Sequence, residues 1–222
     1  MMTAARTLAP PAVGVGTVYW AEGLADLVAV FEPEVQILLH PRPPDPQIAA
    51  YLDSADSRRL GFRRVLDHAR SLVGIGPAAP TWPDLPGREA LLADIRHLCE
   101  VYRELLGCER LGLRFESLNG AMCPGFHRDH TGIRLVCTYR GPGTEWLEAE
   151  GEDPQPHPRP GAARSFAAPA DASAIGRAPA FALVLLKGSL WQGNAGRGAV
   201  HRSPVPPPGG GSRYLLALDA LW

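Results

Sequence analysis

The spacing of apolar residues changes at Gly107, and this change constrains the fold more than any other feature of the sequence. Before it, apolar side chains recur in steps of three and four over residues 88–106, which predicts one long amphipathic helix. They are Leu91, Leu92, Ile95, Leu98, Cys99, Tyr102, Leu105 and Leu106. Gly107 is a natural C-terminal cap for that helix. After it, Leu111, Leu113 and Phe115 alternate with glycine, arginine and glutamate, which is the period of a β-strand.

Short strands are predicted for most of the chain after Gly107. They cover 110–117, a segment around 126–129, 133–139, 144–147, 182–187, 198–203 and 213–221. Turns rich in Gly and Pro separate several of them, at 141–143, 193–196 and 206–211. Many short strands after a helical half indicate an α+β fold. We expect a double-stranded β-helix, a jelly roll of the cupin-like kind, with N-terminal helices packed on it.

The length of 222 residues predicts a single domain with elaborations, and 45% apolar residues are enough for a sizeable core. Residues 1–16 are rich in Ala and Pro and are expected to form a loose arm. Residues 17–107 are expected to be mainly helical, with helices over 20–31, 46–54, 60–73 and 88–106 and a strand over 35–39. The jelly-roll part covers 108–222. Its segment 148–180 is rich in Pro and charge, and we expect an insertion over the barrel mouth.

Composition limits the kinds of partner. The net charge is −1 and no basic stripe stands out, which argues against nucleic-acid binding. No apolar run approaches the ~20 residues of a membrane helix, and the first residues lack the apolar core of a signal peptide. The four cysteines are scattered and form no Cys-x-x-Cys pair, which fits a reducing compartment. We therefore expect a cytoplasmic protein that does not act on a membrane.

A His-x-Asp pair at His127 and Asp129 carries the main chemical signal. On an extended strand the side chains at i and i+2 point to the same face, so this imidazole and carboxylate would lie side by side. His201, between Gly198 and Pro204, supplies a second imidazole just before a hairpin-like loop. Two histidines and one carboxylate form the facial triad of non-haem Fe(II) oxygenases, which leaves positions open for oxygen and a co-substrate.

Arg213 is the candidate for binding that co-substrate. It opens a strongly apolar strand twelve residues after His201, and its guanidinium could hold a dicarboxylate such as 2-oxoglutarate by a bidentate pair. Arg134 and Arg202 are competing candidates for an anionic group. Tyr139, on the strand that follows the His-x-Asp pair, could add a hydroxyl donor.

Two other kinds of site compete with the iron centre. Cys123, His127 and His130 form a Cys-x₃-His-x₂-His cluster, which His201 could complete to four ligands. Thiolate and imidazole ligands suit Zn²⁺, and a closed tetrahedral site would be structural or regulatory. The third reading is a metal-free jelly-roll module that binds a small anion at the barrel mouth.

The pattern resembles the Fe(II)/2-oxoglutarate-dependent oxygenases, especially the prolyl-hydroxylase-like branch, over roughly residues 110–222. The residues that carry the resemblance are His127, Asp129, His201 and Arg213. It implies Fe(II) held by the first three residues and 2-oxoglutarate held by Arg213. It also implies hydroxylation of a small molecule or a protein side chain.

A closer resemblance covers most of the chain. The string Cys-Pro-Gly-Phe-His-Arg-Asp-His at 123–130 is similar to the bacterial domain-of-unknown-function 1826 family, as are the segments 134–146 and 201–204. That family has no established reaction. Its association with zinc-responsive gene neighbourhoods supports the alternative of a zinc-binding protein linked to metal homeostasis.

Overall fold

The described part of the chain forms helices and two β-sheets. The computed structural model describes residues 17–54, 60–67, 82–147, 165–194, 197–205 and 211–222. In chain order, with η for a 3₁₀ helix, the elements are β1 (Thr17–Trp20), η1 (Leu24–Phe31), β2 (Val35–His40), α1 (Pro46–Ser54), β3 (Gly61–Asp67), α3 (Arg88–Leu106), β4 (Arg110–Leu118), β5 (Phe126–His127), β6 (Ile133–Arg140), β7 (Glu145–Leu147), β8 (Ser165–Phe166), η4 (Ala172–Ala174), β9 (Ile175–Arg177), β10 (Leu183–Lys187), β11 (His201–Arg202) and β12 (Arg213–Leu221). Within these segments, no helix has both the length and the apolar character needed to cross a membrane.

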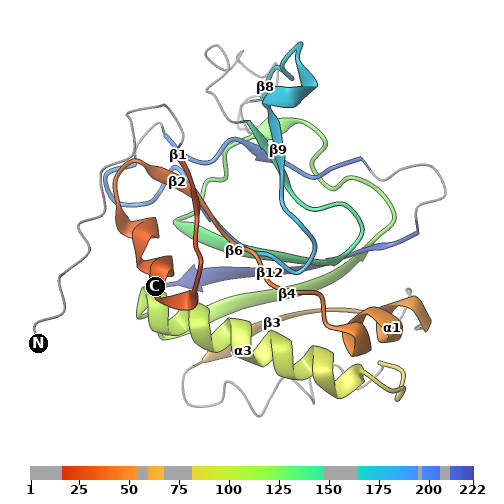
Figure 1. The fold of residues 1–222 in the computed structure, drawn as a ribbon. Helices are drawn as coiled ribbons and strands as arrows, with labels where there is room; N and C mark the ends of the chain where they lie inside the picture. The colour runs from red at the N-terminus through yellow and green to blue at the C-terminus, as the bar shows by residue number, and fades with distance from the viewer. Residues whose placement is uncertain (1–16, 55–59, 68–81, 148–164, 195–196, 206–210) are drawn as a thin grey trace, which may run out of the picture.

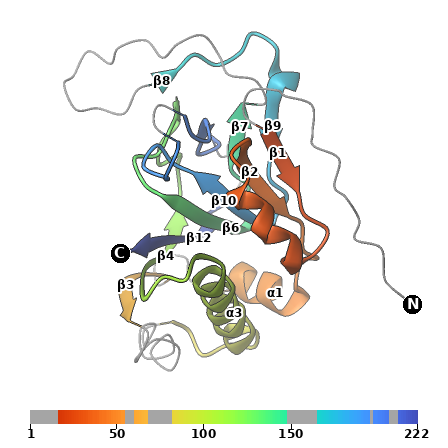
Figure 2. The same ribbon diagram turned by 90° about the vertical axis from the view of Figure 1, so that its left-hand side faces the viewer.

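The larger sheet is the middle layer of the molecule. It has seven strands in the order β1-β2-β10-β6-β12-β4-β3, and a smaller sheet has five in the order β8-β5-β11-β7-β9. Helices α1 and α3 lie against one face of the larger sheet, and the smaller sheet lies on its other side (Figures 1 and 2). The fold is therefore mixed, with helices and two sheets.

Strand β12 shows how one strand serves both layers, because successive side chains point to opposite faces. Leu216 and Leu218 pack into the main apolar cluster, together with the buried stripe of α3. Leu215 and Ala217 pack into a second cluster, on the side of the smaller sheet. A strand buried on both faces has to be almost continuously apolar, and that is the composition of residues 214–218.

The chain crosses repeatedly between the two sheets. From β4 onwards, β4, β6, β10 and β12 lie in the larger sheet, and β5, β7, β8, β9 and β11 lie in the smaller one. This crossing makes β11 a direct neighbour of β5, although 73 positions separate His127 from His201, and it places these two histidines opposite each other. The fold thus brings together the two parts of the predicted metal site.

The strands predicted after Gly107 are present, and so is the helix over 88–106. Its end is also as expected, because Gly107 has the left-handed φ of 62° and donates its N–H to the carbonyl of Arg103. The helix expected over 20–31 is shorter, since β1 ends at Trp20 and η1 starts at Leu24. Between them, the carboxylate of Asp26 accepts the backbone N–H of both Glu22 and Gly23.

The prediction of a helix over 60–73 is wrong where the structure describes it. Residues 61–67 form β3, which pairs with β4 along its whole length. The spacing of Phe62, Val65 and Leu66 suits a helix as well, but β4 offers an edge of unpaired backbone groups, and pairing there decides the local structure. Residues 17–107 therefore supply β1, β2 and β3 to the larger sheet in addition to helices.

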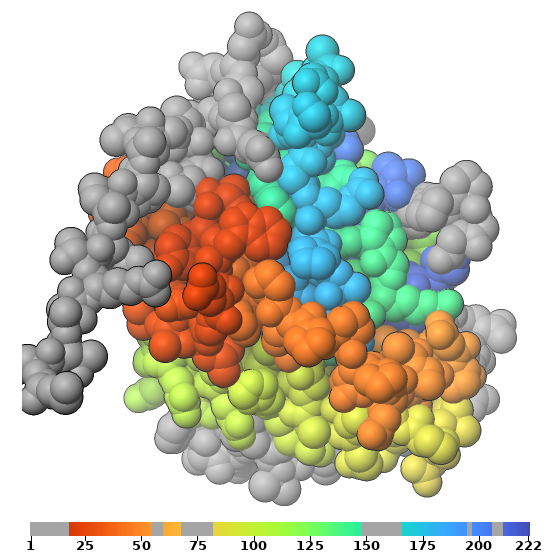
Figure 3. Space-filling view, in the orientation of Figure 1, coloured from red at the N-terminus to blue at the C-terminus, as the bar shows by residue number. Residues whose placement is uncertain are grey.

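Parts of two other expectations lie outside the described residues. These are the arm at 1–16 and, within the expected insertion, residues 148–164. The rest of that segment contains β8 and β9, which belong to the smaller sheet. Figure 3 shows the N-terminal elements (red to orange) packed against segments from the second half of the chain (cyan and blue), in line with the pairing of β2 and β10.

A polar cluster beneath α3 fastens that helix to the sheet. The carboxylate of Asp94 accepts two hydrogen bonds from Arg42, at 2.6 and 3.0 Å, and one from the Tyr139 hydroxyl at 2.6 Å. Arg42 also donates to the carbonyl of Phe181 at 2.9 Å. Tyr139 therefore lies on the helical face of β6, buried in the main apolar cluster. Its hydroxyl donates to Asp94, and Tyr139 is not among the residues that line the cavity of the candidate metal centre, so the structure does not bring it to the site where a co-substrate donor was predicted.

Candidate metal centre

His127 and His201 come from two very short strands that pair side by side. They are direct cross-strand partners in the antiparallel pair β5·β11, and their ring centroids are 4.6 Å apart. Their strand neighbours point the other way, where Arg202 stacks on the ring of Phe126 at 4.3 Å. Alternation along each strand thus turns both imidazoles towards the interior between the sheets.

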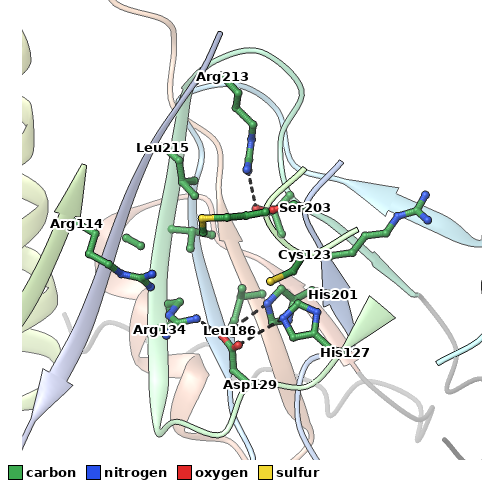
Figure 4. A pocket seen from close by; sticks show the side chains of 15 residues that line it. Arg114, Cys123, His127, Asp129, Arg134, Leu186, His201, Ser203, Arg213 and Leu215 are labelled. Carbon is green, nitrogen blue, oxygen red and sulfur yellow. Dashed lines mark hydrogen bonds and ion pairs between the residues drawn. The ribbon is translucent and has the colours of Figure 1, made fainter. Parts of the chain in front are cut away.

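Asp129 completes the cluster from the residues just after β5 (Figure 4). Its Oδ1 lies 3.5 Å from Nε2 of His127, and its Oδ2 lies 3.6 Å from Nε2 of His201. One ligand atom from each of the three residues lies within 4.8 Å of the other two. The three predicted ligands are therefore brought together.

The backbone fixes the imidazoles in the orientation that a metal needs. Nδ1 of His127 lies 3.0 Å from the carbonyl of Gly125, and Nδ1 of His201 lies 3.0 Å from the carbonyl of Ala199. A carbonyl oxygen only accepts, so the neutral tautomer at each site carries its proton on Nδ1. The lone pair of each Nε2 then points into the cluster, as in metal sites where a ligating histidine donates its other N–H to a carbonyl.

The protonation states also fit a metal site. Burial lowers the pKa of His201 to about 4, even though the charge of Asp129 opposes this. Burial would raise the pKa of Asp129, but the hydrogen bond with His127 and the charges of His201 and Arg134 hold it well below its usual range. For His127 burial lowers the pKa, but its hydrogen bonds with Asp129 and Gly125 outweigh burial and raise it. At neutral pH the cluster offers an ionised carboxylate and a neutral His201, the forms that bind metals.

Arg213 reaches the same cavity from the first residue of β12. The cavity has a volume of about 140 Å³, and both Arg213 and the three clustered residues line it. The Arg213 side chain is held by its neighbours: Nε donates to the carbonyl of Pro142 at 2.9 Å, and Nη2 donates to the hydroxyls of Thr138 and Thr144 at 3.0 and 3.3 Å. These three hydrogen bonds fix the orientation of the guanidinium.

No carboxylate of the described residues forms an ion pair with Arg213, although only 2% of this residue is exposed. Burial lowers its pKa to about 10, with a weaker opposing effect from the charge of Glu145. A buried guanidinium bound only by neutral oxygens is unusual, because buried charges are normally paired. The charge of Arg213 is therefore not balanced by a carboxylate of the described residues.

The other two candidate arginines line the cavity but are already paired with carboxylates. Arg202 donates to Glu145 at 2.7 Å. Arg134 donates to Asp129 at 2.5 Å and to Asp219 at 2.7 and 3.2 Å. Of the competing candidates for the anionic group, Arg213 is thus the one whose charge is not already matched by a described carboxylate.

The residues of the alternative zinc site are not brought together in the same way. Cys123 lines the cavity, but its sulfur does not belong to the group of mutually close ligand atoms. His130 is exposed, and its Nδ1 lies 3.1 Å from the hydroxyl of Ser189. The described residues therefore assemble the three-ligand cluster and not a four-ligand cluster with cysteine.

Three further residues of this region were not among the predicted site residues. Asp219 binds Arg134, and Thr138 and Thr144 bind Arg213. Asp219 was recognisable in principle, because it lies an even number of residues after Arg213 on one strand and so shares its face. Thr138 and Thr144 could not be recognised from the sequence, since their approach to Arg213 depends on how β6 and β7 pack across the cavity.

These features define a protein with two facing sheets and a candidate His–Asp–His metal site between them. The chain belongs to the family described as "Protein of unknown function (DUF1826)", whose sequence profile matches residues 21–219. No curated protein matches it.

Several solved structures of dioxygenases show distant similarity. A dioxygenase for auxin oxidation from rice has 13% identity and a TM-score of 0.45, with 94% of this chain and 83% of that chain covered. Dioxygenase for auxin oxidation 1 from Arabidopsis thaliana, in a complex with 2-oxoglutarate, has 9% identity, a TM-score of 0.49 and coverages of 93% and 92%. T7H from Neurospora crassa, in complex with α-KG, has 13% identity, a TM-score of 0.44 and coverages of 88% and 77%.

Proposed function

We propose that this protein is an Fe(II)- and 2-oxoglutarate-dependent oxygenase of the hydroxylase type. The observation that carries the proposal is the content of one cavity: the His–Asp–His cluster and a buried arginine without a carboxylate partner among the described residues both line it. The first can hold a metal ion, and the second can hold the free carboxylate of a co-substrate.

The topology supports this proposal. Between β4 and β12 the chain crosses repeatedly from one sheet to the other, as expected for a double-sheet jelly roll such as the double-stranded β-helix. In such a barrel the interior between the sheets is the natural place for a small-ligand site. The two histidines lie on neighbouring strands of the smaller sheet, and Arg213 begins a central strand of the larger one. The site is therefore built from both sheets.

The donor set fits iron. His127, Asp129 and His201 would hold Fe(II) through two imidazole nitrogens and one carboxylate oxygen, a set typical of non-haem Fe(II) oxygenases. When bound, the metal would supply the oxidative decarboxylation of 2-oxoglutarate and the oxidation of a C–H bond. The protein's own part is to hold the imidazoles in their neutral form and the Asp129 carboxylate in its anionic form, and to shield the cavity from bulk water.

The co-substrate would be oriented by Arg213. Its guanidinium, fixed by Pro142, Thr138 and Thr144, would pair with the carboxylate of 2-oxoglutarate that is remote from the keto acid. Apolar side chains form part of the cavity wall and exclude water between the two ends, which strengthens that pair. They are Val136, Leu186, Leu215 and Ala217.

The direct test is turnover of 2-oxoglutarate. The protein should bind Fe(II) when reconstituted anaerobically, and on exposure to air with ascorbate it should release succinate from 2-oxoglutarate even without its own substrate. Omission of Fe(II), or its replacement by Zn²⁺, is the control and should give no succinate. A wild-type protein that neither binds 2-oxoglutarate nor forms succinate would contradict the proposal and leave an anion-binding module or a zinc protein.

A zinc site remains the second candidate because the Cys123 thiol lines the same cavity. Since its sulfur lies outside the ligand cluster, Cys123→Ser is expected to retain metal within about twofold of the wild-type content. X-ray absorption of the metal-loaded wild type should show nitrogen and oxygen neighbours only. Sulfur scattering, together with loss of metal in Cys123→Ser, would instead establish the closed zinc site.

A further inference from the structure

Arg134 joins the metal cluster to a second carboxylate behind it. Its Nη1 donates to Oδ2 of Asp129 at 2.5 Å, and its Nε and Nη2 donate to Asp219 at 2.7 and 3.2 Å. Arg134 and Asp219 are direct partners in the register of β6 and β12. Both lie on the interior face of the larger sheet, so the guanidinium is anchored to two paired strands of that sheet as well as to Asp129.

The two oxygens of Asp129 therefore differ. Each oxygen lies near a histidine, since Oδ1 is 3.5 Å from Nε2 of His127 and Oδ2 is 3.6 Å from Nε2 of His201. Oδ2 also accepts the hydrogen bond from Arg134, which leaves Oδ1 the less engaged oxygen. The carboxylate is 13% exposed and Arg134 is 20% exposed, so water competes little for this pair. A charge-assisted hydrogen bond of this kind strongly restricts the rotation of a short side chain.

We infer that Arg134 is a positioning residue, which holds Oδ2 of Asp129 and so makes Oδ1 the oxygen that binds the metal. Asp219 in turn holds Arg134. The hydrogen-bonded chain Asp219–Arg134–Asp129 thus sets the orientation of the Asp129 carboxylate in the cluster. The inference rests on the metal centre of the proposed function. It goes beyond that function because it assigns a task to two residues that touch neither the metal nor the co-substrate.

If Arg134 acted through its charge alone, its removal would have the opposite effect on metal binding from the one that a positioning role predicts. A cation beside a metal site repels the metal, so removal of the Arg134 charge would then strengthen metal binding. A positioning role predicts weaker binding, because loss of a group that orients a ligand typically costs about 10–100-fold in metal affinity. The direction of the change therefore separates the two roles.

The test is a titration of the purified full chain with Co(II), whose visible absorption reports the number and arrangement of ligands. Arg134→Lys keeps the charge but cannot contact both carboxylates with a planar fork. Both Arg134→Lys and Arg134→Gln are expected to bind Co(II) at least tenfold more weakly and with an altered spectrum. Asp219→Asn, which leaves Asp129 untouched, should change affinity in the same direction by a smaller factor, and circular dichroism checks that each variant is folded.

The matched control is Arg114→Lys, since Arg114 reaches Asp219 at 3.4 Å but does not contact Asp129. The Co(II) affinity of Arg114→Lys should stay within about threefold of the wild-type affinity. The inference is overturned if Arg134→Lys keeps wild-type affinity and spectrum, or if Arg134→Gln binds more tightly. Absence of Co(II) binding by the wild type would overturn it together with the metal centre. Normal Co(II) binding without any 2-oxoglutarate binding would refute the oxygenase proposal and leave the role of Arg134 intact.

Discussion

Replacement of His201 by alanine is expected to abolish stoichiometric Fe(II) binding. His201 is only 7% exposed and its Nδ1 is held by the carbonyl of Ala199, so its Nε2 is fixed towards the cluster and alanine removes one of the three ligand atoms. Structural Zn²⁺ sites with four ligands bind with about 10–16 kcal/mol, and on that scale one ligand contributes roughly 3 kcal/mol. That corresponds to a loss of at least about a hundredfold in affinity. The loss of Fe(II) binding is measured directly as the iron content of the variant after anaerobic reconstitution and desalting.

His130→Ala is the matched control for that change. His130 lies three residues from His127, but it is exposed and directed to Ser189. Its loss should leave the iron content unchanged, whereas His127→Ala should behave as His201→Ala does. Because loss of His201 also leaves the Ala199 carbonyl without this partner, a urea titration should accompany the measurement. Full iron content in folded His127→Ala and His201→Ala would refute the assignment of the ligands.

The fold could be predicted best where one local rule acted alone. The stripe of α3 and the alternation in β4 follow directly from periodicity, and both are observed. β3 could not be recognised in this way, because its apolar spacing suits either structure and the free edge of β4 decides between them. A local pattern contains no information on which backbone edges remain unpaired elsewhere in the chain.

In the candidate site, too, the residue contacts that follow from strand periodicity could be predicted, and those that depend on distant parts of the chain could not. The His127–Asp129 spacing predicts a shared face, and the structure brings both residues to His201. The same rule explains why Tyr139 does not line this cavity: it lies five residues after Arg134 on β6, and an odd separation places it on the opposite face. The contact between Arg134 and Asp129 depends on the turn between β5 and β6, which no strand period describes.

The environment of Arg213 links the cavity to its expected ligand. Burial holds the folded-state pKa of Arg213 at about 10, below the value of an exposed arginine. A folded-state pKa below that of the unfolded chain means that the charged form, which predominates at neutral pH, disfavours folding. A carboxylate bound at Arg213 relieves this cost, because it supplies the counter-charge that the described residues do not provide. Binding of 2-oxoglutarate should therefore raise the melting temperature of the wild-type protein.

Arg213→Leu is expected to leave Fe(II) binding intact and to weaken 2-oxoglutarate binding by about ten- to a hundredfold. A charge-assisted pair contributes roughly 1.5–3 kcal/mol, and leucine removes it while it keeps an apolar side chain at the site. Isothermal titration under anaerobic conditions gives the affinity, and succinate formation and the ligand-induced rise in melting temperature should fall with it. The matched control is Arg202→Leu, since Arg202 lines the same cavity but is paired with Glu145. Equal affinity in wild type and Arg213→Leu, or an equal loss in Arg202→Leu, would show that the co-substrate carboxylate binds elsewhere.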